Sequence, residues 1–294
     1  MATGLGPIVQ RALLSAELLR LRRDARKTQD EVAKALDWSV SKVIRIEGGT
    51  VGTSTTDLHA LLRLYGMAEG ETTGELVQLA KGTRERGWWA SYPIDDQQFR
   101  TYLGYEAGAS HIRVFHPTFV PGLLQTMDYA RVILRQFVRN PNDEMIEALA
   151  GLRIERQDRL AERDPAPYRH FILDEGVIRR HVGALAKNGK GIMPAQLRHM
   201  VQAAQDDRVT LQIIPFSKGA HFGMRGAFTL LEFDADLSEV LYLEGVRGGD
   251  LVLTGRDEQI INYRESYEEL EEWTLGPEES CDLILRIADE MSAA

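Results

Sequence analysis

Apolar residues in the first quarter of the chain recur at intervals of three and four, the spacing of one face of a helix. Leu14, Leu18 and Leu21 follow this spacing and predict a helix over residues 8–26. Similar patterns, bounded by capping residues and glycines, predict further helices over 29–36, 39–47, 57–65 and 73–86. The sequence therefore predicts a five-helix N-terminal domain over residues 8–86.

The helices predicted at 29–36 and 39–47 form a helix-turn-helix. Thr28 and Glu31 have the spacing of a capping box, and Ser39 is a suitable N-cap for the second helix, which ends at Gly48. Two short helices joined by so short a break are typical of this motif. The second helix of such a pair lies in the major groove, with its N-terminal residues at the base edges. We expect helix 39–47 to do the same.

The side chains expected to point outward from this second helix combine hydroxyl, cationic and apolar groups. They are Ser39, Val40, Ser41, Lys42, Ile44 and Arg45. Lys42 and Arg45 are one turn apart and suit contacts with guanine or phosphate, whereas Val40 and Ile44 suit contacts with thymine methyl groups. These residues are the predicted base-contacting set.

The start of the first helix of the pair suits a phosphate. Gln29, next to the cap Thr28, would place a side-chain amide and free backbone N–H groups near the DNA backbone. The charge distribution agrees, since residues 1–66 carry ten basic and seven acidic residues, whereas residues 87–294 carry 22 basic and 33 acidic ones. A cationic head on an anionic body indicates that the head makes any phosphate contact.

Three segments of this region, Leu18–Ala25, Thr28–Leu36 and Trp38–Gly48, together resemble the Cro/repressor-type, or xenobiotic-response-element, family of helix-turn-helix proteins. The resemblance covers about residues 11–66 and implies a lambda-repressor-like fold that binds double-stranded operator DNA. The chain departs from the family at Asp37, where glycine is usual in the turn; Asp adopts the left-handed conformation more readily than most residues. Ile44 replaces a commonly small polar residue, so the base preference stays open.

From residue 88 onward the pattern is less regular and mixes helices with short β-rich segments. Helices are predicted over 95–110, 127–139, 143–163, 175–182, 193–206, 257–273 and 278–292, and strands over 168–173, 209–214, 227–233, 240–243 and 251–253. Long helices beside a small sheet indicate an α+β body over residues 88–294. The whole chain is thus an α head followed by a mixed helical body with a small β-sheet.

This body resembles the domain of unknown function that follows such heads in Scr-type antitoxin-like transcriptional regulators of actinomycetes. The resemblance lies in the segments Ile112–Pro117, Val120–Ala130, Arg153–Gln157, Leu173–Glu175, Ile214–Phe216 and Gly219–His221. It implies a small toxin-like partner protein encoded beside the regulator.

The loop over residues 215–226 mixes aromatic, basic and glycine residues between two predicted strands. Two interpretations stay open, because loops carry function on rigid scaffolds but also merely connect strands. The loop is either the edge of a partner- or ligand-binding site or a long hairpin loop with hydrophobic anchors. The binding residues would be Phe216, Lys218, His221, Phe222 and Arg225.

The sequence lacks the patterns of the common catalytic and metal sites. The seven histidines include no pair at helical metal-ligand spacing, the one cysteine cannot form a cysteine-based zinc site, and neither a P-loop nor a nucleophile elbow occurs. No apolar run approaches the ~20 residues of a membrane span, and the N-terminus lacks a secretory pattern. We expect a cytoplasmic protein without catalytic residues, cofactor or metal.

The sequence favours a sequence-specific DNA-binding transcriptional regulator, dimeric and controlled through its body. A homodimer is expected because one head of this size has a modest interface with DNA. The alternative is an antitoxin-like protein whose main act is to bind a small partner, with DNA binding for autoregulation. A third possibility, a small-molecule sensor, predicts a ligand-sized cavity lined by strands of the body.

Overall fold

The computed structural model describes residues 6–68, 70–186, 189–234, 237–245, 249–255 and 257–293. Contacts between residues divide the chain into two compact units. The first unit comprises residues 1–88 with 103–108 and 233–237, and the second comprises the remainder. Most of the secondary structure is helical, and all described strands belong to the second unit.

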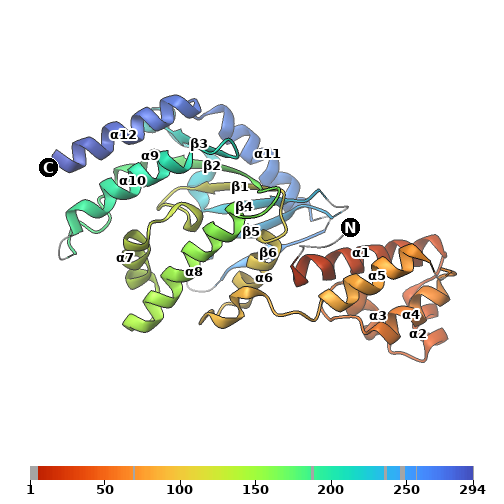
Figure 1. The fold of residues 1–294 in the computed structure, drawn as a ribbon. Coiled ribbons are helices and arrows are strands. Elements are labelled where there is room, and N and C mark those ends of the chain that lie inside the picture. The colour runs from red at the N-terminus through yellow and green to blue at the C-terminus, as the bar shows by residue number, and fades with distance from the viewer. Residues whose placement is uncertain are drawn as a thin grey trace. The chain divides into compact units, whose positions relative to one another are not determined.

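The first unit is built from short helices around one apolar core. These are α1 (Pro7–Asp24), α2 (Gln29–Leu36), α3 (Val40–Glu47), α4 (Thr55–Leu64) and α5 (Glu71–Gly82) (Figure 1). Residues from every one of these helices form the core: Leu14, Leu18, Leu21, Val32, Ala33, Val43, Ile46, Leu58, Leu61, Leu62, Leu76 and Ala80. The predicted spacing of apolar residues placed these helices correctly, except that α5 ends at Gly82, before the predicted Arg86.

Local hydrogen bonds fix the junction between α2 and α3. The Thr28 hydroxyl accepts from the backbone N–H of Glu31, and the Glu31 carboxylate accepts from the backbone N–H of Thr28, so the predicted capping box is confirmed. Ser39 caps α3 through the backbone N–H of Lys42. Asp37 ends α2 at φ 55°, ψ 44°, the left-handed conformation expected at this position.

The second unit holds a six-stranded mixed sheet. Its strands are β1 (His111–His116), β2 (Tyr168–Asp174), β3 (Val209–Ile214), β4 (Phe228–Glu232), β5 (Val240–Leu243) and β6 (Leu251–Leu253), in the order β3-β2-β1-β4-β5-β6. Its helices are α7 (Met127–Phe137), α8 (Asp143–Ala161), α9 (Glu175–Arg179), α10 (Ile192–Ala203), α11 (Glu258–Glu272) and α12 (Pro277–Ala293), together with the first part of α6 (Gln97–Glu106), whose residues from 103 onward are assigned to the first unit. The pairs β1–β2 and β2–β3 are parallel, and the other pairs are antiparallel.

The central strand β1 was not predicted as a strand. It runs from His111 to His116 and pairs with β2 on one side and β4 on the other. The place of β1 between β2 and β4 also shows that the 215–226 loop is not a hairpin loop, so that interpretation was wrong. The loop leaves β3 and enters β4, and two other strands lie between them in the sheet. It therefore crosses the end of the sheet and contains two short 3₁₀ turns, η4 (Phe216–Lys218) and η5 (Phe222–Arg225).

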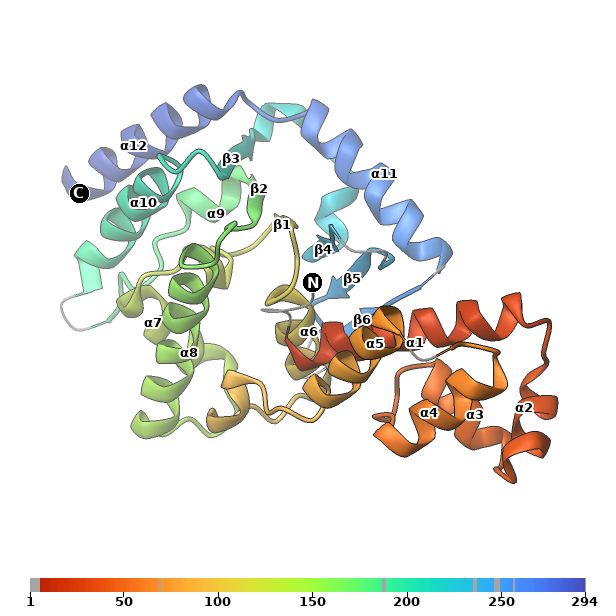
Figure 2. The ribbon, with the colours of Figure 1, turned by 45° about the vertical axis from the view of Figure 1, so that its right-hand side comes forward.

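Helix α11 covers one face of the sheet. Phe115, Ile172 and Leu241 point towards this helix and pack in one cluster with its residues Tyr267 and Leu270. Figures 1 and 2 show α11 on the opposite side of the sheet from α7 and α8. Because side chains alternate along a strand, residues next to these in β1 and β5 point to the α8 side.

Candidate nucleic-acid interface

Helix α3 presents one anchored face and one exposed face. Val43 and Ile46 are buried in the core of the head. On the other side Ser41 and Arg45 are exposed, and 49% of the surface of Ile44 is accessible. The exposed face therefore combines a hydroxyl, a guanidinium and a branched apolar side chain, the groups that contact base edges and thymine methyl groups.

Two residues of the predicted contact set lie differently from the prediction. Val40 was expected to point outward, but it is half-buried and packs against the apolar core. It lies one turn before Val43 and shares its inward face, because residues three apart are neighbours on a helix. That prediction was wrong, and Ile44 is the exposed apolar residue of α3.

Lys42 is held by other side chains of the head. Its Nζ lies 2.8 Å from Oδ1 of Asp57 and 3.6 Å from the centroid of the Trp38 ring. Only 32% of the Lys42 side chain and 25% of the Asp57 side chain are exposed. The lysine thus links α3 to the first turn of α4 and does not extend freely as expected. A DNA phosphate would have to replace Asp57 to engage it.

A polar network anchors the end of α3. The carboxylate of Glu47 accepts hydrogen bonds from Nε and Nη2 of Arg22 at 2.6 and 3.0 Å, and from Nε2 of Gln29 at 2.9 Å. The side chains of Arg22 and Glu47 are 12% and 4% exposed. The bonds to Glu47 raise the pKa of Arg22, and burial only partly opposes them.

This network also redirects two residues predicted to approach a phosphate. The amide of Gln29 is occupied by Glu47, and the hydroxyl of Thr28 is engaged in the capping box. The side chains of Thr28 and Gln29 are thus occupied, and the group left to bind an anion at the start of α2 is the backbone of the helix N-terminus, whose N–H groups favour a negative charge.

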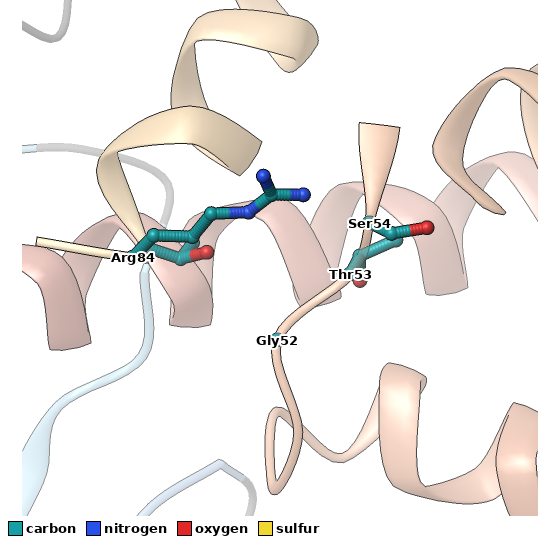
Figure 3. A pocket seen from close by; sticks show the side chains of 5 residues that line it. Gly52, Thr53, Ser54 and Arg84 are labelled. Carbon is teal, nitrogen blue, oxygen red and sulfur yellow. The ribbon is translucent and has the colours of Figure 1, made fainter. Parts of the chain in front are cut away.

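The head contains a pocket of about 310 Å³. Gly52, Thr53, Ser54, Thr83 and Arg84 line it, and Figure 3 shows the Arg84 guanidinium extending towards the loop that carries Thr53 and Ser54. A second pocket, of about 150 Å³, lies in the body beside Met193, Pro194 and Met291. Neither of these two pockets is lined by strands, where the sensor hypothesis placed its cavity.

The predicted body-site residues separate into two groups. Phe216, Lys218 and Arg225 are exposed, with 57% of the Phe216 surface accessible. His221 points inward, with a 2% exposed side chain whose Nε2 lies 3.2 Å from Oδ2 of Asp174. Phe222 packs against the apolar core under α11. The loop therefore has an exposed edge and inward anchors, and the five residues do not form one surface.

Two models of known families match the chain, one near its N-terminus and one over most of the remainder. The model of a domain of unknown function, DUF5753, matches residues 99–286, well over half of the chain. The chain belongs to the DUF5753 family. A helix-turn-helix domain model matches residues 13–76. No curated protein and no solved structure gave a significant match.

The helix-turn-helix match on this DUF5753 protein spans α2 and α3 and identifies the head as a domain of the kind that binds DNA in transcriptional regulators. No described helix is both long and apolar enough to cross a bilayer. In the part of the chain that the structure describes, no three His, Cys, Asp or Glu side chains gather as metal ligands.

Proposed function

We propose that this DUF5753 protein is a dimeric, sequence-specific transcriptional regulator that binds operator DNA with α3. The observation that best supports this proposal is the composition of the exposed face of α3. Ile44 is 49% exposed although Val43 and Ile46 beside it are buried, so the packing of the head does not account for it. An exposed branched side chain flanked by Ser41 and Arg45 suits a thymine methyl group beside hydrogen-bonding base edges.

Arg45 is the main base contact in this proposal, and Ser39 and Ser41 are supporting contacts. The Arg45 Nε donates to the carbonyl of Ser41 at 3.3 Å, an exposed bond within its own helix that gives little resistance to reorientation. Lys42 contributes to phosphate binding after it leaves Asp57. The N-terminus of α2, beside Thr28 and Gln29, holds a second phosphate.

The head belongs in this proposal to the Cro/repressor-type family, with its lambda-repressor-like fold. A single head of this kind buries only about 600–1,000 Å² on DNA, so useful specificity calls for two heads. A homodimer would place them on a pseudo-palindrome with half-sites about 10 base pairs, or a multiple of that, apart. The protein acts in the cytoplasm, on the nucleoid.

An electrophoretic mobility shift on the DNA upstream of the protein's own gene tests the proposal. We expect salt-sensitive, sequence-preferring retardation, and Arg45→Ala should weaken it by about 1–3 kcal/mol. Arg135→Ala is the matched control, since it removes an exposed arginine of α7 that pairs with Asp143 at 2.8 Å. Unchanged retardation of Arg45→Ala, or retardation without sequence preference, would contradict the proposal.

A second candidate function is binding of a small partner protein, as in Scr-type antitoxin-like regulators. It is favoured by the loop between β3 and β4, where Phe216 and Met224 are 57% and 65% exposed and Lys218 and Arg225 are exposed close to them. Exposed apolar side chains with neighbouring charges are typical of interaction sites.

Co-expression with the small protein encoded beside the gene tests this candidate. A stable complex that forms with the wild type and is lost in a Phe216→Ser, Met224→Ser double variant would support it. The variant should still shift operator DNA, because neither residue belongs to the head. Failure of the two proteins to co-purify would count against the partner function and would leave DNA binding unaffected.

A further inference from the structure

The pocket of the head lies between two segments that are distant in the chain. Gly52, Thr53 and Ser54 belong to the loop between α3 and α4, whereas Thr83 and Arg84 directly follow α5. All five residues belong to the first unit. The volume of this head pocket, about 310 Å³, is at the lower end of the range of about 300–1,000 Å³ that is typical of small-molecule pockets.

A glycine keeps the head pocket open. Beyond its chain neighbours, a Cβ at Gly52 would have a single described atom within 4 Å, Oγ1 of Thr83 at 3.7 Å. The Thr83 hydroxyl donates to the carbonyl of Ala80 at 2.8 Å, so its hydrogen is already engaged. Thr83 therefore forms a wall of the pocket, and a larger side chain at position 52 would occupy the space beside it.

Thr53 brings an unused hydroxyl to the head pocket. The residue is only 3% exposed, yet its hydroxyl makes no hydrogen bond with any residue that the structure describes. Protein atoms do not fully enclose the Thr53 Oγ1, so this oxygen faces the pocket that the residue lines. Because buried polar side chains are normally hydrogen-bonded, an unpaired one that faces a pocket indicates a partner outside the protein.

Ser54 adds a second donor and the start of a helix. It caps α4, and its Oγ accepts from the backbone N–H of Asp57 at 3.0 Å. The Ser54 hydroxyl hydrogen has no acceptor among the described residues and can be donated to a ligand. The partial positive charge at the start of α4 favours an anion there. Asp57, in the first turn of α4, opposes this less because its carboxylate pairs with Lys42 at 2.8 Å.

Two arginines give the head pocket a positive charge. Arg84 is exposed, and Figure 3 shows its guanidinium extending towards the loop that carries Thr53 and Ser54. Nη2 of Arg11 donates to the carbonyl of Thr83 at 3.5 Å, and the buried Nε of Arg11 has no described hydrogen-bond partner. Neither guanidinium forms an ion pair with a carboxylate in the described part of the chain. The head therefore leaves this positive charge without a counter-ion.

We propose that the head pocket binds a phosphate group, carried by a small molecule or by the DNA backbone. The guanidinium of Arg84 pairs with the phosphate, and the hydroxyls of Thr53 and Ser54 donate to it. Arg11 adds its charge from the other side of Thr83. A tetrahedral oxyanion presents acceptors in several directions, so it can engage the loop and the end of α5 together. A planar carboxylate, with two oxygens, can satisfy fewer of these donors.

Binding of a free phosphate does not depend on DNA recognition, whereas binding of a backbone phosphate rests on the proposed function. The two can fail separately. If the wild type binds a free phosphate but does not retard the operator, the proposed function fails and the head pocket remains. If the wild type retards the operator, and the pocket variants change neither DNA binding nor phosphate binding, the head pocket fails alone.

Calorimetric titration of the full chain tests the free form of the ligand, with inorganic phosphate and glycerol 3-phosphate as probes and with ionic strength held constant by sodium chloride. We expect saturable binding of at least one probe, and binding weaker by about tenfold for acetate. Arg84→Met, which removes the charge, and Thr53→Val, which removes the hydroxyl, should each weaken binding by about tenfold. Gly52→Leu should weaken it similarly by filling the pocket.

Arg63→Met is the matched control, because it removes an exposed arginine from the last turn of α4, at the other end of that helix. It should leave the titration unchanged. Arg84 and Gly52 are both exposed, so these two substitutions are not expected to unfold the head, and circular dichroism checks this.

Mobility shifts with operator and unrelated DNA distinguish the source of the phosphate. If the head pocket takes a backbone phosphate, Arg84→Met should weaken binding of both DNAs by a similar factor and reduce the salt slope by about 1, while Arg63→Met should not. If it takes a free phosphate only, the titration responds and the salt slope does not change. Absence of both responses, or phosphate binding that persists in both Arg84→Met and Gly52→Leu, would overturn the inference.

Discussion

Substitution of Glu47 by alanine should destabilise the head more than any change to a surface ion pair. Glu47 accepts three hydrogen bonds, two from Arg22 and one from Gln29, and its side chain is 4% exposed. Glu47→Ala leaves the guanidinium of Arg22 buried with only its bond to the carbonyl of Lys27. It also leaves the amide of Gln29 without its acceptor.

The expected cost follows from this geometry. Breaking a buried ion pair by removing one partner costs about 3–5 kcal/mol. Arg22 is 12% exposed and retains one bond, so we expect the lower end, about 3 kcal/mol. For a domain of 60–100 residues, 1 kcal/mol corresponds to about 4–8 °C, so the unfolding temperature of the head should fall by at least about 12 °C.

Differential scanning calorimetry of the full chain, with hydrogen exchange of peptides from α1 to α3 to identify the transition of the head, measures this effect. Glu17→Ala is the control, because Glu17 pairs with Arg20, whose side chain is 55% exposed, and such pairs contribute about 0–1 kcal/mol. A transition lowered no further by Glu47→Ala than by Glu17→Ala would refute the reasoning. The bonds from Arg22 and Gln29 to Glu47 would then stabilise α3 no more than a surface ion pair does.

Three further predictions concern the same domain. Asp57→Asn should release Lys42 and strengthen operator binding a few-fold, measured by mobility shift, whereas Lys42→Ala should weaken it. Asp37→Gly should raise the stability of the head by about 0.5 kcal/mol in urea unfolding, because glycine adopts the left-handed conformation without a steric cost. The bond from the Thr28 backbone lowers the pKa of Glu31 below its ordinary 4.5, so the capping box stabilises fully above that pH and less as pH falls through the lowered pKa. The stability difference between wild type and Glu31→Ala should accordingly shrink on acidification.

Local features of the sequence were sufficient for the helices of the head. Apolar spacing, the Thr28–Glu31 box and the Ser39 cap act within one or two helical turns, so they could be recognised without tertiary information. In strand β1 polar His111 and Arg113 alternate with apolar Ile112 and Val114, which is the period of a strand, but this alternation covers only four residues and was not recognised. Its partners, β2 and β4, lie far along the chain, and pairing between distant segments determined the strand.

The same reasoning explains which contact residues were misplaced. The exposure of Ser41, Ile44 and Arg45 follows from helical periodicity alone. The positions of Lys42 and Gln29 depend on single carboxylates in other helices, at Asp57 and Glu47, and helical periodicity does not show which side chains meet across helices. Prediction from sequence therefore gave the direction of Ser41, Ile44 and Arg45 but not that of Val40, and it did not give the partners of side chains that meet across helices.

That distinction matters most in the body, where residues widely separated in sequence meet. His116 ends β1 and Glu244 directly follows β5, and Nε2 of His116 lies 3.5 Å from Oε2 of Glu244. Taken singly, the histidine was indistinguishable from a buried core residue and the glutamate from a solvated charge. Only the order of the strands in the sheet brings the two residues to one edge, and that order depends on pairing between segments far apart in the chain.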